Sequence, residues 1–210
     1  MSIKEISTDL STAKFDFEDG ALIGAACKQV IADGVVSMLQ AVGDGVDAQG
    51  TADTPKRVAN MYDELLSGYS TDPVELLNGA MFDVEYDEMV VVKDIDFYSL
   101  CEHHLLPFYG KAHVGYLPNN KVIGLSKIPR MVEMFARRLQ VQERMTQQIA
   151  LTLDELIQPA GIGVVVEAQH LCAAMRGVRK PNTTMTTSAL RGQFKKSPST
   201  REEFFSHVRQ

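Results

Sequence analysis

Two short segments of the chain carry residue types that bind zinc and transfer protons. Cys101 and His104 stand three residues apart in Ser-Leu-Cys-Glu-His-His-Leu-Leu-Pro, and the second segment, Gln-His-Leu-Cys, ends at Cys172. Three protein ligands are typical of catalytic zinc sites, which leave a fourth position for water, whereas structural sites usually fill all four. His103 and His170 lie beside these residues in the sequence and are candidates for proton transfer next to a metal. The pattern therefore predicts a catalytic zinc site.

Taken alone, the Cys-x-x-His spacing is a weak signal. It also fits a half-buried cysteine beside two surface histidines, which requires no metal. The rest of the sequence has to decide between these two interpretations.

The length and composition are those of a globular protein with one main domain. The 210 residues are 45% hydrophobic and 23% charged, which is ordinary for a chain that buries a sizeable core. No stretch approaches the ~20 apolar residues of a membrane span, and the N-terminus lacks the apolar core of a secretion signal. The three cysteines, an odd number, do not make a disulfide framework. We therefore expect a cytoplasmic protein without a membrane partner.

The charge distribution favours a small anionic ligand over nucleic acid. A net charge of −6 argues against a general nucleic-acid binder, which should carry a basic surplus. The basic residues nevertheless gather in two places, between positions 121 and 138 and between positions 176 and 196. Two such clusters in an acidic chain can concentrate a small anion, although the alternative of two solvated faces stays open for most of these residues.

Periodicity divides the chain into helices and strands. Helical spacing and N-terminal signals predict helices over 19–42, 54–66, 128–139, 141–156 and a last one that Ser199 and Glu202 would cap. Alternating or β-branched runs predict strands over 89–98, 111–117, 121–124, 163–169 and 183–190. This order favours an α+β fold with an antiparallel sheet. Both metal-binding segments follow predicted strands, so the sheet can bring them together.

Several motifs, in the same order, closely resemble the GTP cyclohydrolase I family. They lie at residues 100–110, 124–127, 140–148 and 170–177, and the resemblance extends from about Asp53 through Val208 without a departure at any motif position. It implies zinc-dependent hydrolysis of GTP to 7,8-dihydroneopterin triphosphate and formate, the first step of folate and pterin biosynthesis. It also implies a tunnelling fold: an antiparallel sheet with paired helices on one side, closed into an oligomeric barrel. We predict an N-terminal helical appendage over residues 1–50 and a catalytic domain over 51–210.

The resemblance assigns the residues that carry the chemistry. Cys101, His104 and Cys172 would bind Zn²⁺. His103 would protonate nitrogen 7 of the guanine so that water can add to carbon 8, and His170 would move protons as the ribose opens and rearranges.

Substrate binding is assigned in the same way. Glu143, with Gln142 beside it, would accept the ring N–H and the amino group that guanine presents side by side. Ser126 would place a hydroxyl near the phosphates or the ribose. The resemblance places four basic residues at the triphosphate, the last of them from a neighbouring subunit: Lys127, Arg130, Arg176 and Arg57. The implied assembly is a decamer of two face-to-face pentamers.

Two further interpretations remain open at this point. A nitrile reductase of deazapurine synthesis shares the tunnelling fold, but it would use a catalytic cysteine and no zinc ligands. A structural zinc protein or nucleotide-binding protein without turnover would need a fourth ligand in place of free histidines. The motifs do not distinguish folate, a pterin cofactor or a deazapurine as the end of the pathway, and none bears on feedback control.

Overall fold

The computed structural model describes residues 24–209, which fall into two compact units divided between Glu64 and Leu65. The first unit is helical, and its elements are α2 (Ala25–Val42), the short 3-10 helix η1 (Gly43–Gly45), α3 (Ala48–Thr51) and α4 (Thr54–Leu65). Within it, an ion pair of 2.7 Å joins Lys28 of α2 to Asp63 of α4. The two long helices were predicted, although the first residues of the range 19–42 lie outside the described residues. The functional division after residue 50 stays a prediction.

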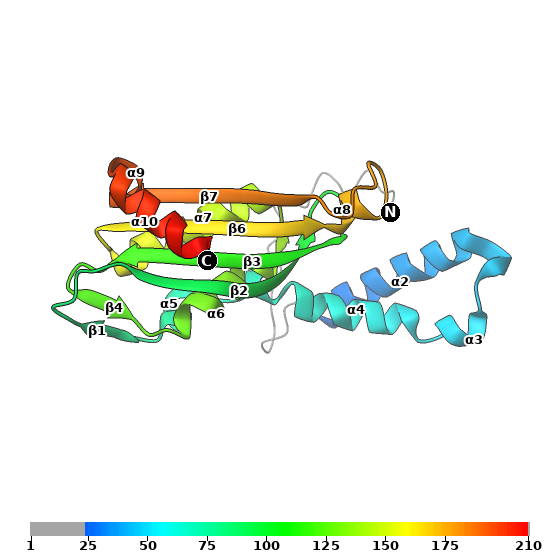
Figure 1. Ribbon diagram of the computed structural model, residues 1–210. Helices are drawn as coiled ribbons and strands as arrows, with labels where there is room; N and C mark the ends of the chain where they lie inside the picture. The colour runs from blue at the N-terminus through cyan, green and yellow to red at the C-terminus, as the bar shows by residue number, and fades with distance from the viewer. Residues whose placement is uncertain (1–23, 210) are drawn as a thin grey trace. The chain divides into compact units, whose positions relative to one another are not determined.

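The second unit is built on a five-stranded sheet with the strand order β5-β2-β3-β6-β7 (Figure 1). The strands are β2 (Val90–Cys101), β3 (Pro107–Leu117), β5 (Leu139–Gln140), β6 (Gly161–His170) and β7 (Thr184–Gly192). All neighbours pair antiparallel except β2 and β5, which are parallel over two residues. Two short strands, β1 (Met81–Asp83) and β4 (Lys121–Ile123), form a separate antiparallel pair. The predicted antiparallel α+β fold is therefore confirmed.

Helices α6 (Lys127–Ala136) and α7 (Gln142–Ile157) cover one face of the sheet and form the main core with it. Alternate strand residues such as Phe108 and Val114 point to this face, and Met131 and Ile149 of the helices meet them, all four fully buried. Side chains of successive strand residues point to opposite faces, so Val165 instead joins a small cluster on the other face with Phe194 and Phe204. The predicted pairing of helices on one side is thus confirmed.

The C-terminal segment supplies the second cluster and corrects one prediction. Its helices are α9 (Gln193–Lys196) and α10 (Pro198–Val208). The side chain that caps α10 is Ser197, whose Oγ accepts the backbone N–H of Thr200 at 3.3 Å, so the predicted cap at Ser199 is wrong. Proline suits the first helical position, so Pro198 starts the helix and the cap falls on the residue before it.

The remaining elements are short. They are η2 (Ser67–Tyr69), α5 (Pro73–Leu77) and α8 (Leu171–Ala174). None of the helices within residues 24–209 combines the length and the apolar character needed to cross a membrane.

A bulge in β2 places a buried histidine of the neighbouring strand β3 in an unusual environment. The register shifts between Val92 and Ile95, and Asp94 takes a left-handed conformation with φ 58°. The backbone N–H of Asp94 donates to Nδ1 of the buried His113 at 3.2 Å. The other ring nitrogen of His113 is buried with no hydrogen-bond partner among the described residues. Burial lowers the pKa of His113 below its usual value.

Candidate active site

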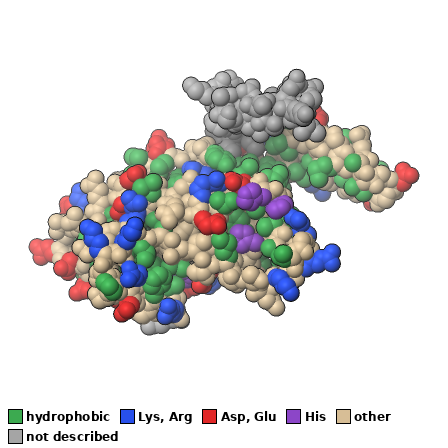
Figure 2. Space-filling view, turned by 90° about the horizontal axis from the view of Figure 1, so that it is seen from above, with side chains coloured by type: hydrophobic (Ala, Val, Ile, Leu, Met, Phe, Trp, Pro, Cys, Tyr) green, Lys and Arg blue, Asp and Glu red, His purple; other side chains and the backbone are tan. Residues whose placement is uncertain are grey.

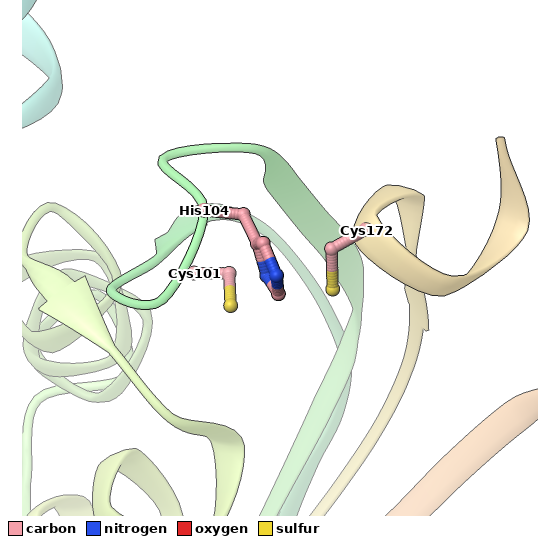
Figure 3. A group of neighbouring side chains, drawn as sticks. All are labelled: Cys101, His104 and Cys172. Carbon is pink, nitrogen blue, oxygen red and sulfur yellow. The ribbon is translucent and has the colours of Figure 1, made fainter. Parts of the chain in front are cut away.

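Strand pairing brings the two metal-binding segments to the same end of the sheet. Cys101 is the last residue of β2, His104 lies in the loop between β2 and β3, and Cys172 lies in α8, immediately after β6. Since β3 lies between β2 and β6, the end of β2 and the end of β6 both flank the start of β3. The three donor atoms lie within 4.8 Å of one another, and Figure 3 shows the side chains side by side, with His104 between the two cysteines.

The loop that carries His104 is tied to Cys101 by backbone hydrogen bonds. The carbonyl of Cys101 accepts the N–H groups of His104 at 3.3 Å and Leu105 at 2.8 Å, while its own N–H donates to Leu106 at 2.9 Å. Leu105 takes a left-handed conformation with φ 54°, which is unfavourable for a residue with a branched side chain. The turn returns the chain at once into β3 and holds the two ligands together.

The donor set fits zinc. Two cysteine sulfurs and one imidazole nitrogen match catalytic zinc sites, which use three protein ligands. Burial raises the pKa of the Cys172 thiol, and the nearby Cys101 raises it further by a smaller amount. Two thiolates this close together repel each other, and a divalent cation between them removes that cost. The site therefore favours a soft, doubly charged metal.

A pocket of about 480 Å³ opens beside the metal-binding residues. Figure 2 shows histidine side chains gathered on one face of the molecule. The pocket is lined by Cys101, His103, His104, Gln140, Val141, Gln142, Glu143, Arg144, His170 and Cys172. Most of the predicted site residues, which come from β2, the loop after it, α7, β6 and α8, therefore share one cavity.

His170 is held on two sides. Its ring stacks on the fully buried Phe108 ring, with centroids 4.7 Å apart and planes 1° from parallel. Its Nε2 lies 2.8 Å from Oε1 of Gln142. Burial lowers the pKa of His170, and the charge of Glu143 partly opposes this shift. The ring is therefore neutral near neutral pH and positioned rigidly at the pocket wall.

His103 is an exposed residue beside Cys101, and its neighbours include a pair of residues that sequence reasoning missed. Its Nδ1 lies 3.8 Å from Sγ of Cys101, and its Nε2 lies 4.0 Å from Oε1 of Glu102. Glu102 in turn pairs with Arg144 of α7, whose hydrogen bond holds the pKa of the Glu102 carboxyl below its usual value. Both residues stand inside the recognised motifs, and that position was the available signal.

Three predicted substrate residues lie outside this pocket. Ser126, Lys127 and Arg130 are at the N-terminal end of α6, whose opposite end leads through β5 to Gln140 at the pocket wall. A helix of 10 residues spans about 15 Å. The buried Lys127 donates from Nζ to the carbonyl of Leu76 at 3.0 Å.

The other two predicted basic residues also lie outside the lining. Arg176 is exposed after α8, near enough to act electrostatically on Cys172. Arg57 belongs to the first unit, where it pairs with Asp53 at 3.5 Å.

Comparison with known proteins identifies a family. A sequence model described as GTP cyclohydrolase I matches residues 31–209. A protein named GTP cyclohydrolase 1 from Campylobacter jejuni subsp. jejuni serotype O:23/36 is 58% identical over 176 residues, which cover 84% of this chain and 93% of that protein. A protein of the same name from Gloeobacter violaceus is 56% identical over 84% of this chain and 82% of its own length. Another from Chlorobium phaeovibrioides is 51% identical over 91% and 86%.

Among solved structures, the apo form of the archaeosine synthase QueF-Like is similar to part of the chain. The match has a TM-score of 0.41 and 17% sequence identity, and it covers 50% of this chain and 93% of that one.

Proposed function

Because the chain belongs to the GTP cyclohydrolase I family, we propose that the pocket beside Cys101, His104 and Cys172 is where it hydrolyses GTP. The protein is an enzyme of this type, with zinc as cofactor, 7,8-dihydroneopterin triphosphate and formate as products, and the tunnelling fold. The nitrile reductase and the structural zinc protein are disfavoured accordingly. The observation that carries the proposal about the site is the convergence of three zinc-binding side chains on a pocket of about 480 Å³.

Proton transfer falls to the two histidines that flank the ligands. Zinc held by Cys101, His104 and Cys172 supplies Lewis acidity, which lowers the pKa of water. His103 donates a proton to nitrogen 7 of the guanine, which makes carbon 8 electrophilic. His170, neutral and fixed against Phe108, moves protons during opening and rearrangement of the ribose.

Guanine recognition falls to Glu143. This residue lies in the first turn of α7, where the helix dipole favours a negative charge, and it lines the pocket. Within residues 24–209 no hydrogen bond or ion pair occupies its carboxylate, so both oxygens are available to the N–H and amino groups of guanine. Adenine presents the reverse donor and acceptor pattern and would leave buried polar groups unpaired.

The triphosphate is bound by residues from more than one copy of the chain. Ser126, Lys127 and Arg130 lie in the first part of α6, away from the end that leads to the pocket, and none of them lines it. These residues of one copy therefore serve the pocket of another. Arg176 of the same copy as the metal ligands and Arg57 of a neighbour complete the basic set. Together they offset the charge of the triphosphate.

Open sheet edges favour such an assembly. Strand β7 forms one edge of the sheet and pairs only with β6 among the described strands. Strand β5 forms the other edge, and it pairs with β2 at Leu100 and Cys101 alone. Long unpaired edges are usually covered, and closure into a barrel of several copies covers both at once. Helix α2 also exposes apolar side chains, among them Val30, Met38 and Val42. The arrangement that we propose is a decamer of two pentamers.

We place the enzyme in the cytoplasm and expect no nucleic-acid partner. Cys101 and Cys172 are free thiols in the structure, and they must remain reduced to bind zinc. The product then enters folate or pterin biosynthesis.

Incubation with GTP carrying carbon-13 at carbon 8 tests the reaction at this site. The wild-type enzyme should release the label as formate, and His103→Ala should release almost none while retaining zinc. Label that stays in the nucleotide with the wild type, or full release by His103→Ala, would contradict the proposal.

Complementation tests the shared site. Cys172→Ser and Lys127→Ala should each be nearly inactive at low GTP, but co-assembly of the two should restore a measurable fraction of activity, because some pockets receive an intact metal site and an intact lysine. Mixing Cys172→Ser with His103→Ala is the matched control and should restore nothing. Recovery only in the control, or in neither mixture, would refute a site shared in this way.

A further inference from the structure

We infer that Gln142 is a positioning residue that fixes the tautomer of His170, so that His170 exchanges protons through Nδ1. This inference rests on the proposed catalytic role of His170. Gln142 is only 1% exposed although it lines the pocket, and its side-chain amide is engaged on both ends. Those contacts determine which nitrogen of His170 carries the hydrogen.

The orientation of the Gln142 amide follows from its surroundings. Its Nε2 lies 3.0 Å from the carbonyl oxygen of Val166 and 2.9 Å from that of Met185. Backbone carbonyls only accept hydrogen bonds, so the group that faces them must be the NH₂. A flipped amide would direct its own oxygen at two carbonyl oxygens, which is strongly repulsive. The assignment of nitrogen and oxygen therefore rests on the hydrogen-bond network.

Two threonines support the same assignment. The hydroxyl of Thr146 donates to the backbone carbonyl of its own helix at Gln142, at 2.8 Å. That use of its hydrogen leaves Thr146 Oγ1 to accept from Thr187 at 2.7 Å, and Thr187 Oγ1 is then free to accept from Gln142 Nε2 at 3.1 Å. Each hydroxyl donates once and accepts once, so the ring of bonds is consistent only with NH₂ at this position.

The other end of the amide then decides the state of His170. Oε1 of Gln142 can only accept, and it lies 2.8 Å from Nε2 of His170, so Nε2 must carry a hydrogen. In a neutral imidazole the second nitrogen is then an acceptor. Nδ1 has no hydrogen-bond partner within residues 24–209. Stacking on Phe108 fixes the plane of the ring, so Nδ1 has a defined direction.

This arrangement distinguishes the role of Gln142 from that of a residue that binds the substrate directly. Both hydrogens of its NH₂ are directed at protein acceptors, and its oxygen is directed at His170. Loss of the amide should therefore reduce turnover, because the tautomer of His170 is no longer fixed. The affinity for GTP should stay unchanged, because Glu143 and the basic residues still bind it. A group that contacts GTP directly would show the opposite signature, a raised KM.

Steady-state kinetics on the zinc-loaded enzyme provide the first part of the test. Gln142→Met keeps the length of the side chain without the amide, and it should lower kcat roughly 10–100-fold, as loss of a residue that orients a reactive group does, with KM for GTP nearly unchanged. Thr187→Val, which never touches the pocket, should lower kcat by a smaller factor. Thr186→Val is the matched control, since Thr186 is the preceding residue of β7 and points to the other face; it should behave as wild type. A raised KM with unchanged kcat in Gln142→Met, or equal effects of Thr187→Val and Thr186→Val, would overturn the inference.

Imidazole nitrogen chemical shifts from enzyme labelled with nitrogen-15 in histidine provide the second part, with the His170 signals assigned by their loss in His170→Ala. Hydrogen on Nε2 is expected in the wild type, and a mixture of tautomers in Thr187→Val or Gln142→Met. Hydrogen on Nδ1 in the wild type would contradict the inference directly. Full turnover by His170→Ala would instead refute the proposed role of His170, and this outcome is distinguishable because the tautomer is measured without turnover.

Discussion

The two ends of helix α6 differ in how much of the proposed binding site a single copy of the chain provides. At the C-terminal end, β5 brings Gln140 against the end of β2, and the pocket contains a metal-binding group, two flanking histidines and a free carboxylate. At the N-terminal end, Lys127 is directed at the carbonyl of Leu76, and Arg130 lines a separate cavity of about 200 Å³. In our proposal, the tertiary fold alone assembles the groups for chemistry and base recognition, whereas the binding of phosphate depends on a second copy.

The largest effect should come from breaking the metal-binding end. Cys172→Ser should lose zinc and activity together, because only two of the three ligands remain. His103→Ala should keep one zinc per chain and lose most turnover, because in our proposal His103 supplies a proton and is not a zinc ligand. Metal analysis and GTP turnover on both variants check this. If His103→Ala also loses zinc, the division between ligand and proton donor is wrong.

Breaking the phosphate-binding end should weaken substrate binding while the zinc site stays intact. Removal of one charge-assisted contact costs about 1.5–3 kcal/mol, so Lys127→Ala should raise KM for GTP by roughly one to two orders of magnitude. The salt dependence of binding should also become flatter, because one charge is lost. KM measured at several ionic strengths tests both statements. An unchanged KM would show that Lys127 serves only its own backbone contact with Leu76.

A substitution at Glu143, in the pocket, sharpens the comparison through base recognition. Glu143→Gln turns one acceptor into a donor facing a guanine N–H, and it should cost at least a tenfold loss in GTP affinity, about 1.4 kcal/mol, with zinc content unchanged. Inosine triphosphate lacks the amino group, so it should bind the wild type more weakly and lose less affinity in Glu143→Gln. Lys127→Ala should leave this discrimination intact. Equal losses for both nucleotides would mean that Glu143 is an ordinary solvated residue.

The smallest effect concerns stability rather than activity. Burial lowers the pKa of His113, so the unfolded chain takes up a proton at this residue before the folded chain does. The contribution of His113 is therefore fully present above the ordinary histidine pKa of about 6.5 and is lost as the pH falls from there toward the lowered folded value. His113→Gln, which can still accept the N–H of Asp94, should show a shallower loss of unfolding free energy on acidification. Identical slopes for the two proteins would contradict this assignment.

The sequence predicted the parts of this architecture that have local signals. The β-branched runs before Cys101 and before His170 were correctly assigned to strands, so the meeting of the metal-binding residues followed from pairing alone. Strand β5 was not predicted, because a strand of two residues shows no periodicity. It nevertheless positions the buried Gln140 at the site, where the Gln140 side chain donates hydrogen bonds to the carbonyl of Phe135 and to Gln148.

The separation of the two ends of α6 could not be read from the sequence either. Motif residues such as Ser126 and Lys127 carry no information about distance until the helix that holds them is placed. The same holds for the ion pair of Glu102 and Arg144, since the two residues are remote in sequence and approach only through the packing of α7 beside the loop after β2.

Titration of zinc into metal-free enzyme, with formate release from GTP followed at each step, tests the central claim most directly. Activity should rise in proportion to zinc and reach its maximum at one zinc per chain, with one formate released for each GTP consumed. Cys172→Ser should remain inactive at the same zinc concentrations. Formate release without zinc, or a zinc-loaded wild type that consumes GTP without forming formate, would contradict it.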